Sequence, residues 1–548
     1  MAPHTPNTDS VARALRCLAY GLVAALFAWI VSLYYIPGEG FTYLIEFGEL
    51  NHSRLLPEIR AVNHFEQAQS IGYDGQWYAQ IAVHPRLTDP VLKGAVDLVH
   101  YRARRILFEW TAWVLGGGDP IRIMNAYALQ NVAWWFMLAV LLLRWFPPAS
   151  WGNGFRWASV LFSFGLIFSL RGALPDGPCL LVVALGMALL ESGHSWWSAL
   201  VFGLSGLGKD TSILCGSALG PPASRTSRAR IAYLCQAVLV ALPLTIWVGC
   251  LRLLLGPGDT LGWSNFSFPG LEVARKILGT VSSLVAEKHP LASVPMFDGL
   301  VLAGLLAQFL FFVLRVRLKD PWWRLGASYA VLLLFLGKAV WEDYPSAASR
   351  VLLPMTLAFN VRVPRGGWWP ALLVAGNLGI LGSVDFIGSS LPDRLGACFV
   401  VEGPSQLRFN AKDNFGITAT YGPGNWWGPE SERMPGKRDW DTWRWTRGDA
   451  TITIHNPQPF TVLAELTFGM ATSDPRHAVV TMDGKIAWQA ALKPAQDNLA
   501  TLTGIELPPG DTPLQFRTDR PAVEGGNGDH RRFAFSVRDL KITLVGRR

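Results

Sequence analysis

Long apolar stretches recur through the first 390 residues of this chain, and they restrict it to a membrane-spanning fold. The first runs from about Leu18 to Ile36, close to the roughly 20 residues that an α-helix needs to cross a bilayer. Others lie near residues 104–117, 122–146, 155–173, 177–192, 195–219, 229–254, 296–317, 325–341, 349–363 and 367–387. Half of the 548 residues are hydrophobic and only 16% are charged, which argues against a soluble enzyme. We therefore predict an α-helical polytopic membrane domain over residues 1–390, with roughly 10 to 12 membrane segments.

Two of these segments are unusual. The stretch at 104–117 is short, which predicts a partial or tilted membrane helix. The stretch at 195–219 is interrupted by Gly208, Lys209 and Asp210. Charged groups at membrane depth are costly and normally face a cavity or a partner, so we expect two half-helices that turn back.

Basic residues collect in alternate loops, which predicts the orientation of the domain. They are Arg13, Arg144, Arg156, Arg225, Arg228, Arg230, Arg315, Arg317, Lys319, Arg324, Arg362 and Arg365. With one re-entrant pair at 195–219, all of them fall on one side of the membrane. Because cytoplasmic loops carry the excess of Lys and Arg, this side and the N-terminus are predicted to be cytoplasmic. The opposite, exterior side then receives Asp176, Glu287, Glu342, Asp343 and Asp385.

The exterior side also receives a large loop at residues 37–103. Its apolar residues recur at helical spacing, which predicts helices lying in the membrane interface. They are Leu44, Ile45, Phe47, Leu50, Trp77, Tyr78, Ile81 and Ala82.

Residues 391–548 have the composition of a separate all-β domain. Short alternating segments appear at 450–454, 460–468 and 533–537, and Asp483-Gly484 is typical of a two-residue hairpin turn. We predict a β-sandwich or jelly roll on the exterior side. Trp426, Trp427 and Trp443 could belong to its core or bind glycan. The six cysteines include no CxxC pair, so we predict no disulfide framework and no structural zinc.

The stretch Gly72-Tyr73-Asp74-Gly75-Gln76-Trp77-Tyr78 places one carboxylate on a glycine-flanked turn in the exterior loop. Asp74 directly precedes a helical pattern, so it could simply be the N-cap of that helix. The other interpretation is a general base that meets a hydroxyl group at the membrane face.

Further charged groups lie on the predicted exterior face, and together they suit a substrate that carries a phosphate. They are Arg102, Arg104, Arg105, Asp176, Lys209, Asp210, His289, Glu342 and Arg350. Each also has a simpler explanation. The three neighbouring arginines could bind lipid headgroups, and Asp176 could cap a helix. Lys209 and Asp210 could form a structural ion pair, and Arg350 could reach to the interface.

Several function classes are disfavoured. No GxGxxG, Walker A, HExxH or GxSxG motif occurs in a suitable context, and the predicted cytoplasmic loops are too short for a nucleotide-binding domain. The net charge of +8 arises without basic runs interleaved with aromatic residues, so no nucleic-acid partner is predicted.

Six motifs together resemble those of bacterial GT-C glycosyltransferases, which are similar to the mannosyltransferases of the GPI and dolichol-phosphate pathways. They are Gly-Tyr-Asp-Gly-Gln-Trp-Tyr-Ala-Gln-Ile-Ala at 72–82, Tyr-Arg-Ala-Arg-Arg-Ile-Leu at 101–107, Leu-Pro-Asp-Gly-Pro at 174–178, Gly-Lys-Asp-Thr at 208–211, Ser-Arg-Val-Leu-Leu-Pro at 349–354 and Trp-Arg-Trp-Thr-Arg-Gly at 443–448. The first motif has a single acid where some relatives have Asp-x-Asp. We therefore predict no metal site and no required cofactor. The participation of a divalent cation is an alternative that the sequence leaves open.

The resemblance implies a specific reaction. Such enzymes take a sugar from a polyprenyl-phosphate donor, and an acceptor hydroxyl group of a glycan, lipid or protein attacks the anomeric carbon with inversion. Asp74 would be the general base. The donor phosphate would be bound by Arg102, Arg104, Arg105, Lys209 and Arg350. The acceptor would be oriented by Tyr73, Gln76, Tyr78, Asp176, His289 and Glu342. The protein would lie in the bacterial inner membrane, with the sandwich in the periplasm.

Two rival functions come from other classes. A transporter or lipid flippase would use Lys209, Asp210 and Lys338 as ionisable groups near the membrane interior. No repeat relates the two halves of the membrane region, and the charges gather at one face, which disfavours this function. A non-catalytic, glycan-binding envelope protein would leave the apolar helices and the first-loop acid without a role.

Overall fold

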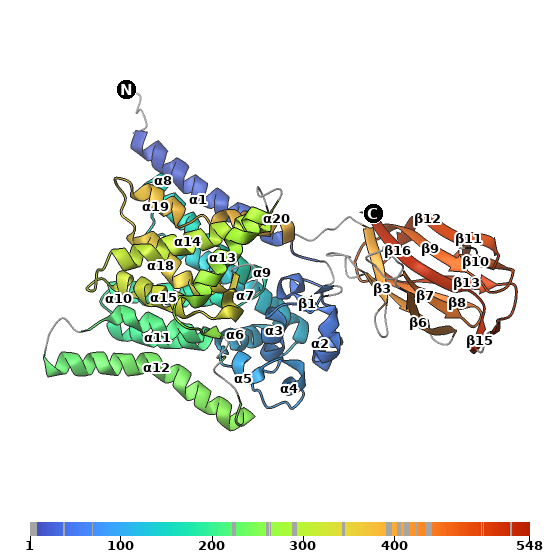
Figure 1. Ribbon diagram of the computed structural model, residues 1–548, viewed down its shortest axis with the longest axis horizontal. Helices are drawn as coiled ribbons and strands as arrows, with labels where there is room; N and C mark the ends of the chain where they lie inside the picture. Colours follow the sequence, from blue (N-terminus) through green and yellow to red (C-terminus); the bar gives the residue numbers. More distant parts are fainter. Residues whose placement is uncertain are drawn as a thin grey trace, which may run out of the picture.

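The computed structural model describes residues 8–36, 39–67, 70–221, 226–258, 262, 265–287, 293–341, 346–390, 397–402, 407–409, 417–422, 425–432, 441–494, 496, 498–526 and 529–548. His289 and Glu342 lie outside these residues. A helical part up to residue 390 is followed by an all-β part, and Figure 1 shows them as two bodies. The predicted fold class is confirmed.

The chain begins with helix α1 (Thr8–Ser32), which starts about ten residues earlier than the apolar run predicts because it includes the basic residues before that run. The predicted exterior loop follows α1 and contains η1 (Thr42–Ile45), β1 (Phe47–Gly48), η2 (Glu49–Arg54), α2 (Pro57–Arg60), β2 (Glu66–Gln67), α3 (Gly75–Val83), α4 (Leu92–Ala95) and α5 (Val99–Arg102). These short elements form a compact unit. Leu44, Phe47 and Trp77 are buried in a core shared with the next two helices, so these side chains pack inward and not toward a membrane surface.

The central helices are α6 (Leu107–Gly116), α7 (Pro120–Leu142), α8 (Trp151–Leu161), α9 (Phe164–Arg171), α10 (Asp176–Glu191), α11 (Ser195–Gly208), η3 (Asp210–Leu219) and α12 (Ser227–Leu255). The break at Lys209 is confirmed. Trp322 contacts Glu191, just before α11, and Arg324 donates to the carbonyl of Ala218, near the end of η3. The beginning of α11 and the end of η3 therefore lie at the same end of the bundle, and the pair turns back.

The last helices are α13 (Leu271–Ala286), α14 (Val294–Leu314), α15 (Pro321–Phe335), α16 (Lys338–Trp341), α17 (Ser346–Val351), α18 (Leu353–Arg362), α19 (Trp369–Ala375) and α20 (Ile380–Ser390). Several predicted single helices are split. The segment 349–363 is divided before Pro354, which occupies the first turn of α18, where a missing backbone N–H costs least. The segment 155–173 is divided at Ser163, whose ψ of 143° is extended.

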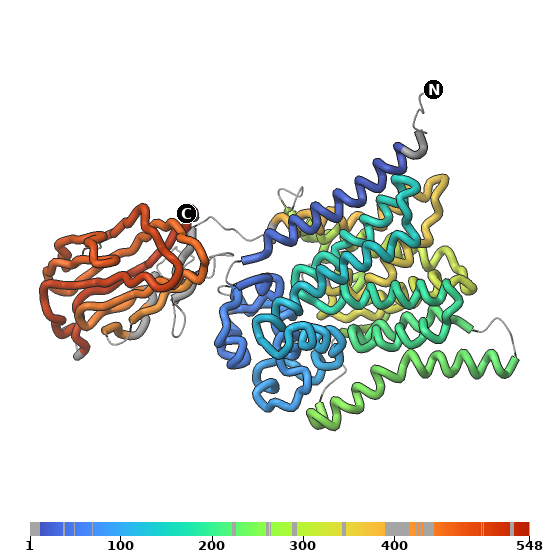
Figure 2. The backbone as a smooth tube through the Cα atoms, turned by 180° about the vertical axis from the view of Figure 1, so that it is seen from behind, coloured from blue at the N-terminus to red at the C-terminus, as the bar shows by residue number. Residues whose placement is uncertain are grey.

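Among the described residues, five helices are long and apolar enough to cross a membrane, which is characteristic of a membrane protein. They cover Val11–Ser32, Pro120–Leu142, Ser227–Leu255, Val294–Leu314 and Trp369–Gly388. This is fewer than the 10 to 12 segments predicted, because many of the other apolar segments are short or broken. Figures 1 and 2 show α12 lying along one side of the bundle, and its apolar window is only 17% buried.

The all-β part contains β3 (Ala397–Glu402), β4 (Leu407–Phe409), β5 (Thr418–Tyr421), β6 (Trp426–Glu432), β7 (Asp441–Thr446), β8 (Ala450–Asn456), β9 (Val462–Ala471), β10 (Arg476–Met482), β11 (Lys485–Leu492), β12 (Asn498–Leu507), β13 (Gly510–Thr518), β14 (Val523–Gly526), β15 (Asp529–Phe533) and β16 (Ser536–Arg547). The strands β11-β10-β13-β8-β5-β4-β3 pair in that order. A second set contains β12, β9, β16, β7 and β6, and β3 joins the sets by pairing with both β4 and β16.

The two strand sets share one core. Ile452 and Phe516 from the first set and Phe468 and Ile542 from the second are all fully buried in it. The predicted hairpin is confirmed: Met482 pairs with Lys485 across a turn in which Asp483 and Gly484 both have positive φ.

Candidate functional site

Two glycines fix the position of Asp74. Gly72 has a φ of +71°, and a Cβ there would lie 2.5 Å from the carbonyl oxygen of Glu46. A Cβ on Gly75 would lie 2.3 Å from the carbonyl oxygen of Gly172, just after α9. Only glycines allow the chain to pass so closely, so this turn is held against the rest of the domain.

Asp74 does not cap α3. It occupies the N-cap position, but its backbone is helical and its side chain makes no capping hydrogen bond. Instead Arg102 Nη2 donates to Asp74 Oδ1 at 2.8 Å. The side chain of Asp74 remains 33% exposed, whereas that of Arg102 is 9% exposed. The N-cap interpretation is therefore wrong, and the carboxylate is presented at the edge of a buried cation.

The electrostatic environment keeps Asp74 ionised. Burial alone would raise the pKa of its carboxyl, but the nearby guanidinium of Arg102, with smaller contributions from Arg350 and Arg105, outweighs burial and holds this pKa below its ordinary value. Burial alone would lower the pKa of Arg102, but the neighbouring Tyr78, Asp74 and Asp97 outweigh burial and raise this pKa. A carboxylate in this setting is negatively charged at neutral pH and accepts hydrogen bonds.

A tyrosine and a second arginine extend the site. Arg105 donates to the hydroxyl groups of both Tyr78 and Tyr101, the latter at 2.9 Å. Burial raises the pKa of Tyr78 to about 12, so its hydroxyl stays protonated. Tyr78 also lies 3.5 Å from Arg102 Nη1, which links the two arginines through one phenol.

Asp176 forms ion pairs with two more cations. Lys209 Nζ lies 2.6 Å from its Oδ1, and Arg350 Nη1 lies 3.2 Å from its Oδ2. Arg350 also donates to the hydroxyl of Tyr73 at 3.1 Å, next to Asp74 in sequence. Asp176 is the first residue of α10, and the N-cap position of this helix is occupied by Pro175. Its side chain therefore serves the charged cluster and not the helix.

Lys209 and Asp210 do not form the ion pair with each other that one interpretation of the sequence predicted. Asp210 lies 3.1 Å from Arg104 Nη2 and 3.5 Å from Arg105 Nη2, while Lys209 contacts Asp176. The backbone break between α11 and η3 separates the two side chains. That break therefore serves to pair each of them with a different segment.

The simpler explanations for the cations are also wrong. Arg102, Arg104, Arg105, Lys209 and Arg350 are each only 7–8% exposed. Buried guanidinium groups cannot cover a lipid surface, and Arg350 is bound to Asp176 and does not reach outward. Five cations from distant parts of the chain therefore converge at one end of the bundle.

The space between these groups is small. The cavity beside Asp176, Lys209 and Arg350 has a volume of about 10 Å³, roughly enough for one water molecule and too little for a phosphate. The ion pairs fill the site. A phosphate could enter only if it replaced some of the acids as the partner of these cations. The Nε atoms of Arg104 and Arg105 are available as donors, because both are buried without hydrogen-bond partners among the described residues.

Sequence reasoning missed two acids. Asp97 accepts two hydrogen bonds from Arg102, at 2.8 and 3.1 Å, and so shares this cation with Asp74. The only local signal of this pairing in the sequence was the position of Asp97 five residues before Arg102. Glu109 on α6 is fully buried, and neither of its carboxylate oxygens has a hydrogen-bond partner among the described residues.

Other predicted site residues stand apart from this cluster. Gln76 is buried and holds the loop by donating to the carbonyl of Ile71 at 2.8 Å. In the sandwich, Trp426 is a core residue, while Trp427 and Trp443 are partly buried and donate to Arg532 and Glu430. Their glycan-binding role stays a prediction. Among the described residues, no group of three or more His, Cys, Asp or Glu side chains is placed to hold a metal ion.

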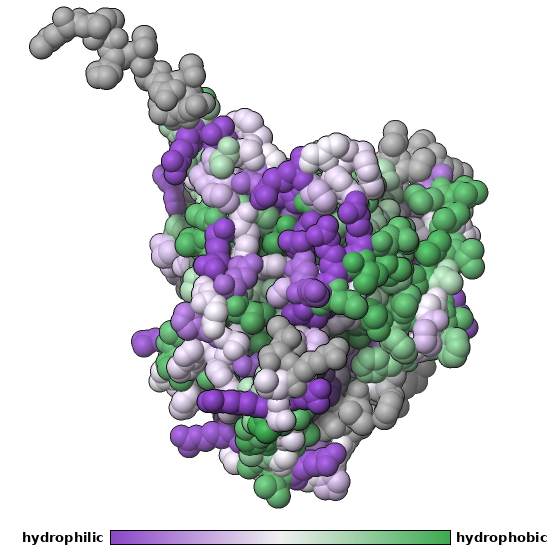
Figure 3. Space-filling view, turned by 90° about the vertical axis from the view of Figure 1, so that its left-hand side faces the viewer, coloured by the Kyte–Doolittle hydropathy of each residue, from purple (hydrophilic) through white to green (hydrophobic). Residues whose placement is uncertain are grey.

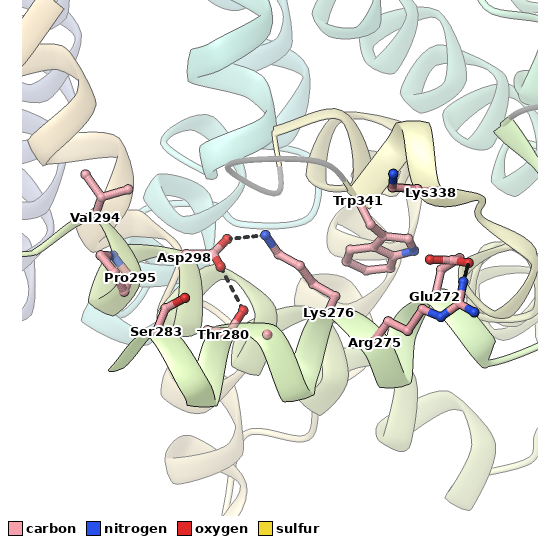
Figure 4. Close-up of a pocket in the computed structure, with 11 residues that line it drawn as sticks. Glu272, Arg275, Lys276, Thr280, Ser283, Val294, Pro295, Asp298, Lys338 and Trp341 are labelled. Carbon is pink, nitrogen blue, oxygen red and sulfur yellow. Dashed lines mark hydrogen bonds and ion pairs between the residues drawn. The ribbon is translucent and has the colours of Figure 1, made fainter. Parts of the chain in front are cut away.

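An open cavity of about 700 Å³ lies between α13, α14 and α16 (Figure 4). Asp298 on α14 contacts Lys276 at 3.1 Å and accepts a hydrogen bond from Thr280 at 2.8 Å, both from α13. Trp341 also lines the cavity, and its buried Nε1 has no hydrogen-bond partner among the described residues.

The cavity lies at the same end of the bundle as the charged cluster. Asn265 donates to the hydroxyl of Tyr101 at 3.1 Å, and its carbonyl accepts from Gly337, the residue before α16. The outward face of α13 is apolar: Leu278 is 71% and Val285 83% exposed. The cavity thus combines polar groups inside with an apolar outer wall.

Comparisons with known proteins give little further guidance. No family model matches the chain, and no curated protein matches it either. Among solved structures, the chain is similar to the cryo-EM structure of the arabinosyltransferase EmbB from Mycobacterium smegmatis, with 9% sequence identity and a TM-score of 0.21. The alignment covers 80% of this chain and 59% of EmbB, so the chain spans less than two thirds of that protein. A TM-score this low supports no conclusion about function.

Proposed function

We propose that the chain is a membrane glycosyltransferase that transfers a sugar from a polyprenyl-phosphate-linked donor to a hydroxyl group of a glycan, lipid or protein. The observation that carries this proposal is the position of Asp74, a partly exposed carboxylate 2.8 Å from the buried Arg102. Tyr78 links Arg102 to the buried Arg105, and three more buried cations lie in the neighbouring ion pairs. This arrangement supports a role for Asp74 as the base for the acceptor and for the cations as binders of a phosphate leaving group. The motif resemblance to GT-C enzymes supports the same reaction.

The chemical step follows from these groups. The acceptor oxygen forms a bond to the anomeric carbon of the sugar, and its proton passes to the carboxylate of Asp74. The bond from the anomeric carbon to the phosphate oxygen breaks, and its electron pair leaves on the phosphate. Because attack and departure occur on opposite faces of the sugar, the anomeric configuration inverts.

Arg102 and Arg105 are the proposed main binders of the departing phosphate, since paired guanidinium hydrogen bonds match phosphate geometry. Arg104, Lys209 and Arg350 supply further positive charge. These cations are held by ion pairs with Asp97, Asp176 and Asp210. Such preorganisation lowers the free-energy cost of stabilising the negative charge that develops on the departing phosphate.

The cavity between α13 and α14 is the proposed site of the lipid-borne substrate. Its interior offers Lys276, Lys338 and the indole N–H of Trp341 to a polar head, and the exposed apolar face of α13 can continue along an isoprenoid chain. No cofactor is proposed. We further propose that this end of the bundle faces the periplasm of a bacterial inner membrane, and that the sandwich binds glycan there.

The test measures transfer by the purified full chain in lipid nanodiscs. The donors are a panel of radiolabelled polyprenyl-phosphate-linked hexoses and pentoses, with cell-envelope lipids and glycans as acceptors. With a donor that the wild type uses, Asp74→Asn should lower the transfer rate by about 10²-fold or more while donor binding is retained. Asp97→Asn is the matched control, because Asp97 also pairs with Arg102 but is not the proposed base. Equal rates for wild type and Asp74→Asn would exclude the base role.

A transporter remains the second candidate because of one observation, the discontinuous helix pair at Lys209, whose charge lies inside the bundle. Transport predicts movement of a labelled polyprenyl-phosphate lipid across a sealed vesicle without any change in its sugar. Transfer of the label to an acceptor in the nanodisc assay, where no compartment exists, would exclude pure transport.

A further inference from the structure

A second charged cavity lies at the opposite end of the helical bundle from Asp74. Helix α10 begins at Asp176, in the charged cluster, and ends at Glu191, so its two ends are about 24 Å apart at 1.5 Å per residue. Trp322 Nε1 donates to Glu191 at 2.7 Å. Beside it, a cavity of about 340 Å³ opens between the α14–α15 connection and the segment that follows α18. This size lies within the range of about 300–1,000 Å³ that is usual for small-ligand sites.

Arginines dominate the lining of this cavity. They are Arg315, Arg317, Arg362 and Arg365, and Asp320 is the only acid among the described residues that line it. Asp320 is already engaged: it caps α15 by accepting from Trp322 N and lies 2.6 Å from Arg362 Nε. Among the described residues, no acid lies within ion-pair distance of the other three arginines. The cavity therefore carries an uncompensated positive charge.

Contacts within the protein hold the walls of the cavity. Arg156 on α8 donates to the carbonyl groups of Asn360 and Pro364, the latter at 3.0 Å, which fixes the segment after α18. The guanidinium of Arg315 lies 4.3 Å from the ring centroid of Trp369. Arg362 is held by Asp320, whereas Arg317 and Arg365 are exposed. Because the guanidinium group is planar, an arginine loses less side-chain freedom per hydrogen bond to an anion than a lysine does.

The rim of the cavity is apolar. Leu314, Val316 and Leu318 alternate with Arg315 and Arg317 and are 76%, 61% and 67% exposed, and Trp368 is 63% exposed. Figure 3 views this end of the bundle and shows hydrophilic residues over its middle, with hydrophobic residues to one side. Exposed aliphatic and Trp side chains next to arginines are typical of the boundary between lipid tails and headgroups.

We propose that this cavity binds the headgroup of an anionic phospholipid, with the phosphodiester against the arginines and the acyl chains along the apolar rim. The ligand class is a phospholipid such as phosphatidylglycerol, whose headgroup carries a phosphate and no cation. A zwitterionic headgroup such as that of phosphatidylcholine is disfavoured because its ammonium would meet the same arginines. The site is independent of the proposed sugar transfer, and it would anchor the cytoplasm-facing end predicted by the distribution of basic residues.

The test titrates the full-length protein, purified in an uncharged detergent, with dioctanoyl phosphatidylglycerol and counts bound lipid by native mass spectrometry. Arg317→Gln with Arg365→Gln should weaken binding about 25-fold, since each arginine near a lipid phosphate is worth a factor of about five. Arg228→Gln with Arg230→Gln is the matched control, because both residues are exposed at the start of α12 and do not line the cavity. The control should bind as the wild type does.

Three results would overturn the proposal. They are equal binding of dioctanoyl phosphatidylcholine, equal weakening in the control variant, and unchanged binding in the cavity variant. Inorganic phosphate provides a further arm. If it displaces the lipid at equal concentration, the cavity is a site for soluble anions and the lipid assignment is wrong.

Discussion

The carboxylate of Asp74 lies 2.8 Å from the guanidinium of Arg102, and this contact joins the turn at residues 72–75 to the end of α5 across 28 residues. It holds the pKa of Asp74 below its ordinary value against the opposing effect of burial. A group with a depressed pKa loses its negative charge only when the pH falls through that lower value. If Asp74 is the base, its protonation should therefore not reduce the transfer rate between about pH 7 and about pH 5.

Arg102→Met tests this linkage. Without Arg102, the effect of burial is opposed only by the smaller contributions of Arg350 and Arg105, so the pKa of Asp74 rises. The acid limb of the profile of kcat/KM against pH should then move to higher pH, in addition to any loss of rate from weaker phosphate binding. The measurement is this profile for wild type, Arg102→Met and Arg102→Lys. Lysine retains the charge and should leave the limb near its wild-type position; an identical limb in all three proteins would show that Asp74 is not the titrating group.

The double ion pair of Asp176 predicts a large effect on stability. Asp176→Ala would leave Lys209 and Arg350 buried without their shared partner, which typically costs about 3–5 kcal/mol. Unfolding in mixed micelles should show this loss. Glu506→Ala is the control, because the side chains of Glu506 and its partner Arg548 are 54% and 73% exposed and their ion pair should contribute less than about 1 kcal/mol. Similar losses in both variants would contradict a special role for the buried pair.

The close approach at Gly75 predicts loss of activity without any change in charge. In Gly75→Ala the new Cβ would meet the carbonyl oxygens of Gly172 and Ile45 at 2.3 and 2.7 Å, so the backbone that carries Asp74 must move. We expect destabilisation of about 1–3 kcal/mol together with a drop in the transfer rate larger than the loss of folded protein explains. Gly94→Ala in the same loop has no atom within 4 Å of the new Cβ and should leave both quantities unchanged. Wild-type transfer by Gly75→Ala would show that the turn tolerates displacement.

The sequence predicted what depends on neighbouring residues and failed where partners are distant. The Asp483–Gly484 hairpin follows from local turn chemistry, and the break at Lys209 follows from charges inside an apolar run. The partner of Lys209, however, is 33 residues away and that of Arg350 is 174 residues away, and no periodic pattern encodes such pairings. The sequence could identify the charged groups of the site but not the pairs they form.

Helix α13 was missed for a different physical reason. Its apolar residues, such as Leu278 and Val285, face outward, and its polar residues, such as Lys276 and Thr280, face the cavity. Its mean hydropathy is therefore too low for a membrane span, and its apolar stripe suggests a soluble amphipathic helix. Only the arrangement beside α14 shows that the polar face is the interior one (Figure 4).

This inverted helix provides a way to test the proposed lipid site separately from the chemistry. Gly279 lines the cavity, and a Cβ added to it would have no other atom within 4 Å, so Gly279→Trp can fill the space without a backbone clash. If the lipid-borne substrate binds there, this variant should raise KM for the polyprenyl-phosphate donor about tenfold or more, the effect of losing about 1.4 kcal/mol of binding, while kcat changes little. Ala274→Trp is the matched control, because Ala274 is exposed on the same helix and does not line the cavity. Equal KM values in the two variants would place the lipid elsewhere, whereas a fall in kcat alone would mean that the cavity contributes to the chemical step and not to donor binding.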